Sequence, residues 1–245
     1  MASPETSRAG ASDPAAALPQ AVWNDTPYRD VNLALGAMGQ ALARMYRFPI
    51  DKDEAETLAS MDSNDENDLF MSQANCRKGA ETLKTCFASG NPDATLQAAR
   101  DDFHKLFVGP LTLRAIPWSS AYIDSDGLFG PTARAVRETF TENGFEIPEG
   151  RTEPSDHVAY ELQFLAEMHK RAEVSWGCDP SPDEEARKAL VQARGFKQRF
   201  IDPWIGDFLN CVDCGSRVEA YRGIADLTRG FLAIEDDFLN KVLAG

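Results

Sequence analysis

The chain has 245 residues, of which 43% are apolar, so it can bury a core as one large domain or two small ones. Its 39 acidic and 25 basic side chains give a net charge of -14, which argues against a nucleic-acid backbone or an anionic membrane as partner. No apolar run approaches the roughly 20 residues that a membrane-spanning helix needs.

The N-terminal segment differs in composition from the rest of the chain. Residues 1–22 are rich in Ala, Ser and Pro and carry few large apolar groups, so we expect a disordered tail without an export signal, followed by one domain over 23–245. The five cysteines are odd in number and irregularly spaced, which does not indicate a disulfide framework. A reducing cytoplasm is therefore the simplest location.

Helical periodicity dominates from residue 27 onward. Val31, Leu35, Met38, Leu42 and Met45 recur at steps of three and four, which predicts a core helix that begins near Pro27. The same period predicts further helices, and runs of alternating β-branched residues are nearly absent. These helices are expected over residues 66–88, 92–107, 131–144, 154–175, 182–210, 215–229 and 231–243. The sequence thus predicts an all-α bundle of about eight to nine helices.

One long segment, Val108 to Phe129, has no helical period. It contains two prolines, two glycines and three aromatic side chains. A loop of this length within a compact helical domain is usually functional.

The stretch "EPSDHVAYELQFLAEM", residues 153–168, places Glu, Asp and His close together. A residue before proline is pushed out of the α region, so we expect Glu153 as N-cap, Pro154 as the first helical residue and Asp156 in the first turn. On this helix Asp156 falls on the polar arc. Adjacent Asp156 and His157 point to different sides, so the stretch does not predict an acid/base dyad.

Beside the core stripe of this helix runs a second row, made by His157, Glu161, Phe164 and Met168. The row is either the edge of a peptide-binding surface or, for Phe164 and Met168, simply core. A metal site that uses Glu153, His157 and Glu161 is a further alternative, although no second helix carries matching ligand spacing.

Three segments resemble one known family in order and spacing. "EPSDH" followed by "ELQFLAEM" resembles the acidic-His signature of the TorD/DmsD family of redox-enzyme maturation chaperones. "DFHKLFVGP" (102–110) and "PWSSAYIDSDGLFGPTARAVRETF" (117–140) resemble two other segments of that family. The likeness covers most of residues 30–210. One departure is Phe200, which stands four residues before Trp204 where family members often have His.

The resemblance implies a cytoplasmic chaperone without enzymatic activity or cofactor. Its partner would be the twin-arginine signal peptide, and also the apo catalytic subunit, of a dimethyl-sulfoxide-reductase-type molybdoenzyme. A related branch would instead serve a nitrate reductase without an export signal. No nucleic acid or membrane insertion is implied, and the chain would be a monomer or a domain-swapped dimer about a hinge near 144–156.

Residue by residue, the resemblance places peptide binding on two parts of the chain. Carboxylates would hold the two guanidinium groups, and an apolar groove would hold the stretch that follows them. The peptide-binding positions are Trp118, Tyr122, Asp124, Gly130, Asp156, His157 and Glu161. Asp126, Phe129, Phe164 and Met168 would add further carboxylate and apolar surface.

Two other features favour plain structural roles. "CVDC" at Cys211 to Cys214 is a single pair without a second pair or a strand-helix context, which favours two cysteines on a helix over a metal or redox centre. Trp204 lies four residues before Phe208 in a helical stretch, and this spacing favours a core aromatic.

Overall fold

The computed structural model describes most of the chain from Trp23 onward. The described residues are 23, 26–65, 68–88, 90–109, 112–125, 127–128, 130–147, 153–176 and 181–244. The predicted tail over 1–22 and part of the predicted hinge lie outside them. No described helix is long and apolar enough to cross a membrane.

The described residues form helices joined by turns, which confirms the all-α prediction. The α-helices are α2 (Tyr28–Arg47), α3 (Lys52–Ala59), α4 (Ala74–Ala88), α5 (Pro92–Phe103), α6 (Ser120–Ile123), α7 (Pro131–Glu142), α8 (Val158–Ser175), α9 (Glu184–Phe196), α10 (Ile205–Gly215) and α11 (Glu219–Ala244). Two π-helical segments, η2 (His104–Val108) and η3 (Lys197–Ile201), continue α5 and α9.

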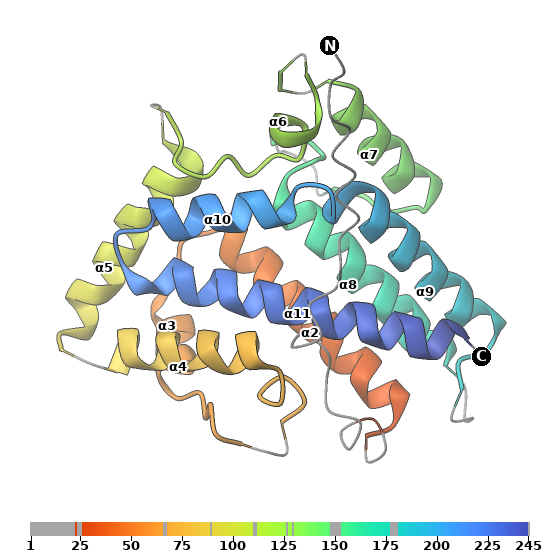
Figure 1. The fold of residues 1–245 in the computed structure, drawn as a ribbon, viewed down its shortest axis with the longest axis horizontal. Helices are drawn as coiled ribbons and strands as arrows, with labels where there is room; N and C mark the ends of the chain where they lie inside the picture. The colour runs from red at the N-terminus through yellow and green to blue at the C-terminus, as the bar shows by residue number, and fades with distance from the viewer. Residues whose placement is uncertain are drawn as a thin grey trace, which may run out of the picture.

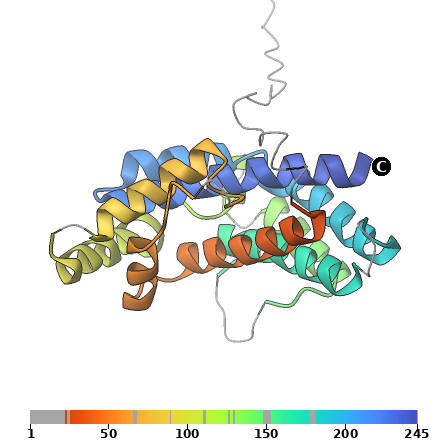
Figure 2. The ribbon, with the colours of Figure 1, turned by 90° about the horizontal axis from the view of Figure 1, so that it is seen from below.

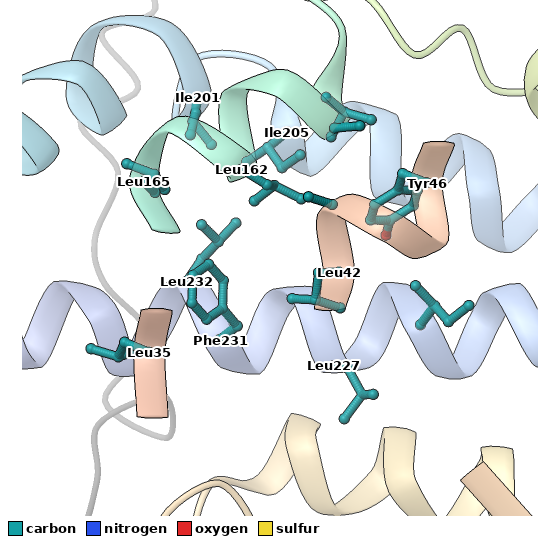
Figure 3. Close-up of a cluster of buried hydrophobic side chains, with 14 of the residues drawn as sticks. Leu35, Leu42, Tyr46, Leu162, Leu165, Ile201, Ile205, Leu227, Phe231 and Leu232 are labelled. Atoms are coloured by element: carbon teal, nitrogen blue, oxygen red, sulfur yellow. The ribbon is translucent and has the colours of Figure 1, made fainter. Parts of the chain in front are cut away.

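The helices form two layers (Figures 1 and 2). The long helix α11 crosses the middle of the molecule with α4 on one side and α10 on the other, and α2 and α8 pack together in the second layer. Side chains from both layers meet in a continuous apolar core, of which Leu42, Leu162 and Phe231 are fully buried members (Figure 3). Helices α6 and α7 lie at one edge, above the beginning of α8 (Figure 1).

Local capping explains several helix starts. The Asp51 side chain accepts the Glu54 N–H while the Glu54 carboxylate accepts the Asp51 N–H, a reciprocal arrangement that satisfies two free donors at the start of α3. Asn91 and Asp183 cap α5 and α9 through their side-chain oxygens. These caps fix where the periodic segments become helical.

Several predicted helix bounds are wrong. Residues 68–73 form turns, so α4 begins only at Ala74. The stretch 182–210 is broken at residues 202–204, because Pro203 cannot donate a backbone hydrogen bond to a continuing helix. Conversely, residues 215–229 and 231–243 lie largely in one helix, because Gly230 is helical and lets α4 approach at Cys76.

Candidate functional site

The segment that contains Trp118 lies antiparallel to the chain that leads into α8. The Val158 N–H donates to the Pro117 carbonyl at 2.8 Å, and the Ser119 N–H donates to the Asp156 carbonyl at 3.0 Å. The resulting β-bridge pairs Trp118 with His157, whose rings meet edge to face with centroids 6.1 Å apart. Two sequence-predicted site segments, nearly 40 positions apart in the chain, therefore adjoin.

His157, not Glu153, is the N-cap of α8. Its Nδ1 atom accepts the Ala159 N–H at 3.1 Å, so in the neutral ring the proton is on Nε2. Burial lowers the pKa of His157 to about 4, because the imidazolium is disfavoured away from water; Glu153 opposes this shift and the Arg47 charge adds to it. The predicted start at Pro154 is four residues too early, because the 117–120 segment binds the Asp156 carbonyl and the Val158 N–H.

Asp156 is fully buried and does not lie on the polar arc of α8. Its Oδ2 atom accepts the Ser120 N–H at 2.9 Å, at the start of the short helix α6. Its Oδ1 atom is buried without a hydrogen-bond partner. A buried carboxylate oxygen without a donor is costly, so this atom marks a place where a donor is missing.

Glu161 lies one turn further along α8 and is also buried. Burial raises its pKa well above the ordinary value, and the nearby Asp156 charge acts in the same direction, while the nearby Ser119 hydroxyl and the Trp204 indole N–H oppose the shift. The Trp204 indole N–H donates to Oε2 of Glu161 at 3.1 Å and to the Phe200 carbonyl at 2.7 Å. Burial therefore shifts Glu161 toward its neutral, protonated form.

Tyr122 connects α6 to α10. Its ring lies against Trp204, with centroids 5.2 Å apart. Its hydroxyl is hydrogen-bonded to the Cys211 thiol and to the backbone of Ile116, and burial raises its pKa. The side chain remains half-buried, as does that of Trp118, so both aromatic rings keep part of their surface in solvent.

Asp124 and Gly130 form the start of α7. The Asp124 carboxylate accepts the Thr132 hydroxyl at 2.6 Å through Oδ1 and the Thr132 N–H at 3.2 Å through Oδ2. A Cβ at Gly130 would lie 2.7 Å from Asp124 Oδ2, so a larger residue there would require the Asp124 side chain to move. Both positions hold the loop in shape, and Asp124 keeps part of its surface exposed.

The sequence left open whether Phe164 and Met168 on α8 are part of a peptide-binding surface or of the core. The structure places both in the core. Phe164 and Met168 are fully buried, and Phe164 lies among Phe140, Phe145 and Phe196. Apolar surface next to the site comes instead from Ile123 and Leu128, whose side chains are exposed. The sequence-predicted positions Asp126 and Phe129 lie outside the described residues.

Three further points concern the aromatic residue Trp204, the metal-site alternative and a contact that the sequence did not reveal. Trp204 is buried, which confirms its prediction as a core aromatic, and Phe200 is buried beside it on η3. No group of three or more metal-ligating side chains occurs in the part of the chain that is described, and Glu153, His157 and Glu161 form no such group. Sequence reasoning missed the link from Trp204 to Glu161, for which a separation of 43 residues leaves no local signal.

Comparisons with known proteins agree with this picture. The family model described as "Nitrate reductase delta subunit" matches residues 72–210. The chain is 27% identical over 148 residues to the chaperone protein TorD of Vibrio parahaemolyticus, covering 60% of this chain and 66% of the relative. It is 29% identical over 165 residues to TorD of Photobacterium profundum, covering 66% of this chain and 71% of the relative. The match thus spans about two thirds of each relative's length, and the chain belongs to the TorD/DmsD family of chaperones.

Proposed function

We propose that this chain is a cytoplasmic chaperone of redox-enzyme maturation that binds the twin-arginine signal peptide of a dimethyl-sulfoxide-reductase-type molybdoenzyme. It would also hold the apo catalytic subunit until the cofactor is inserted and before export. Family membership and relatives named as chaperones support this function. The proposal includes no catalytic step by this chain.

The observation that carries the proposal is the unsatisfied Asp156 Oδ1 atom behind the Trp118 segment. A guanidinium group offers five N–H donors and a full positive charge, which is what this buried carboxylate oxygen lacks. Asp156 has no exposed surface, so binding requires the 117–120 segment to move. The segment is held by the β-bridge between residues 118 and 157 and by the Ser120 N–H bond to Asp156 Oδ2, so these contacts must break when it moves.

The apolar part of a signal peptide also finds suitable surface here. Trp118 and Tyr122 are half-buried, and Ile123 and Leu128 are 39% and 44% exposed. Contact with these side chains would remove apolar area from water. Together with charge-assisted hydrogen bonds, this contact supports a Kd of about 1 μM, a strength that still allows release.

Isothermal titration with a twin-arginine leader peptide tests the proposal. We expect micromolar binding, and roughly ten-fold weaker binding or more when both arginines become lysine, because lysine cannot donate in a bidentate fork. Asp156→Asn keeps an acceptor for the Ser120 N–H but removes the charge, so it should weaken binding by a similar factor.

Asp101→Asn is the matched control, because Asp101 is an exposed residue on α5 and its loss changes net charge equally. Thermal unfolding of each variant checks that the fold is intact. Equal affinity of the wild type and Asp156→Asn, or of the arginine and lysine peptides, would contradict the proposed site.

A second candidate client is a nitrate reductase that lacks an export signal, which the description of the matching family model favours. Its N-terminal peptide carries no twin-arginine pair. Tighter binding of such a peptide than of the twin-arginine leader would select this client. Light scattering during the same titrations distinguishes a monomer from a dimer.

A further inference from the structure

The pair Cys211 and Cys214 lies at the C-terminal end of α10, beside the candidate site. Both thiols are free; Cys211 is half-buried and Cys214 is exposed. Residues three apart in an α-helix have Cα atoms about 5 Å apart, within the range of a disulfide, but their Cβ atoms are about 5–6 Å apart, roughly 1 Å too far. A bond between them requires a small distortion of the last turn and is therefore easily reduced.

Cys211 touches the candidate site directly. Its thiol is hydrogen-bonded to the Tyr122 hydroxyl, and the Tyr122 ring lies against Trp204, which donates to Glu161. If the Cys211 sulfur turns toward Cys214, Tyr122 loses this partner. The Tyr122 side chain, which lines the candidate site, would then be held less firmly.

The end of α10 is also tied to the segment that leads into Trp118. The Arg114 guanidinium donates to the Gly215 carbonyl at 3.0 Å, next to Cys214. Arg222 donates to the Asp213 and Ser216 carbonyls at 3.1 and 2.8 Å. Distortion of the turn that contains Cys214 therefore shifts a carbonyl that positions Arg114, four residues before Trp118.

We propose that Cys211 and Cys214 form a reversible disulfide when the chain meets a low-molecular-weight disulfide such as oxidised glutathione. This bond would loosen the position of Tyr122 in the candidate site. The exposed Cys214 thiolate attacks one sulfur of the oxidant and expels one thiolate. The Cys211 thiolate then attacks the Cys214 sulfur and expels the second. Two electrons pass to the oxidant, and the two protons lost by the cysteines balance those taken up by the released thiols.

The other described cysteines are poorly suited to this reaction. Burial raises the pKa of Cys76 to about 12 and also raises the pKa of Cys86, so both remain thiols at neutral pH. Neither has a second cysteine within one helical turn in the sequence. Cys86 is half-buried and provides a matched control for a partly accessible single thiol.

Mass spectrometry tests the disulfide without any client peptide. Trypsin releases residues 200–217 as one peptide that contains both Cys211 and Cys214. After the reduced protein is treated with oxidised glutathione and alkylated, we expect this peptide to be unalkylated and lighter by two hydrogens, and to recover with dithiothreitol. In Cys214→Ser this loss of two hydrogens should not occur, whereas Cys86→Ser should behave as wild type. A stable glutathione adduct on Cys214, or equal oxidation of Cys86, would overturn the pairing.

The effect on the site has two measurements. Near-ultraviolet circular dichroism should change on oxidation of the wild type and not of Cys214→Ser, since Tyr122 and Trp204 are in contact. Leader-peptide affinity, which rests on the proposed function, should fall about three- to ten-fold on oxidation, the effect of one lost hydrogen bond. Disulfide formation without a dichroism change would overturn the coupling, whereas failure of any leader to bind would contradict only the proposed function.

Discussion

At the start of α8, burial shifts His157 and Glu161 toward their uncharged forms. Burial lowers the pKa of His157 to about 4, so its ring is neutral at pH 7, and burial also raises the pKa of Glu161 well above its ordinary value. Arg47 lies close by, with its guanidinium 4.8 Å from the centre of the Tyr160 ring. A shift toward the neutral forms lowers the cost of burying these groups where the 117–120 segment packs against α8.

His157 gives the fold a specific acid sensitivity. Its pKa is near 6.5 in the unfolded chain and about 4 in the fold, so the folded state binds fewer protons. The contribution of the neutral His157 to the free energy of unfolding is about 3 kcal/mol. It is fully present above pH 6.5 and is lost as the pH falls through about 4. His157→Asn keeps a capping oxygen but does not titrate. Urea unfolding should therefore give a larger free energy of unfolding for wild type than for the variant at pH 7, and this difference should shrink or reverse at pH 4.

His104→Asn is the control for that prediction, because His104 is an exposed histidine on η2. Its free energy of unfolding should run parallel to wild type over the same pH range. A His157→Asn curve that also runs parallel would show that the imidazole is already accessible to protons in the fold.

The sequence indicated which residues lie close together better than it indicated how they are arranged. Trp118, Asp156 and His157 do adjoin, as the resemblance implied, but Asp156 is buried under a segment nearly 40 residues away in the chain. A helix projection treats residues 153–157 as if they were part of a free helix. Backbone hydrogen bonds from Val158 to Pro117 and from Ser119 to Asp156 override that local preference, and no local pattern encodes them.

Among the helices, periodicity located the elements, and close packing decided how far they run. Gly79 on α4 faces Gly223 on α11, where a Cβ on Gly79 would lie 2.6 Å from the Gly223 carbonyl oxygen. Gly230, further along α11, meets α4 in the same way at Cys76. Sequence alone suggests that such a glycine breaks a helix, but here each one allows two helix backbones to approach.

Gly79→Ala tests this packing. Alanine normally stabilises a helix relative to glycine by about 1 kcal/mol, but here the added methyl meets backbone atoms of α11 that cannot move aside. We expect a net loss of about 2–3 kcal/mol in the free energy of unfolding, measured with urea.

Gly195→Ala on α9 is the matched control, because nothing lies within 4 Å of a Cβ added there. This change should raise the free energy of unfolding by about 0.5–1 kcal/mol. Equal effects of the two substitutions would mean that α4 and α11 can move apart at little cost.

Across the whole molecule, the dominant electrostatic property is the net charge of -14. The candidate site is not itself a cluster of free charges, since burial shifts Glu161 toward its neutral form and the Asp124 carboxylate is hydrogen-bonded to Thr132. Long-range attraction of a cationic leader would therefore come from the molecule as a whole, and short-range recognition from Asp156. These two contributions differ in how they respond to salt.

Stopped-flow measurement of leader binding separates them, provided that the proposed function holds. Raising the ionic strength from about 0.01 to 0.1 M shortens the screening length from about 30 to 10 Å, so the association rate should fall several-fold while the dissociation rate changes less. The lysine peptide carries the same charge and should show the same salt slope at weaker affinity. A peptide with glutamine in place of both arginines should show a much flatter slope. An association rate for the arginine peptide that does not change with salt would place its recognition entirely at short range.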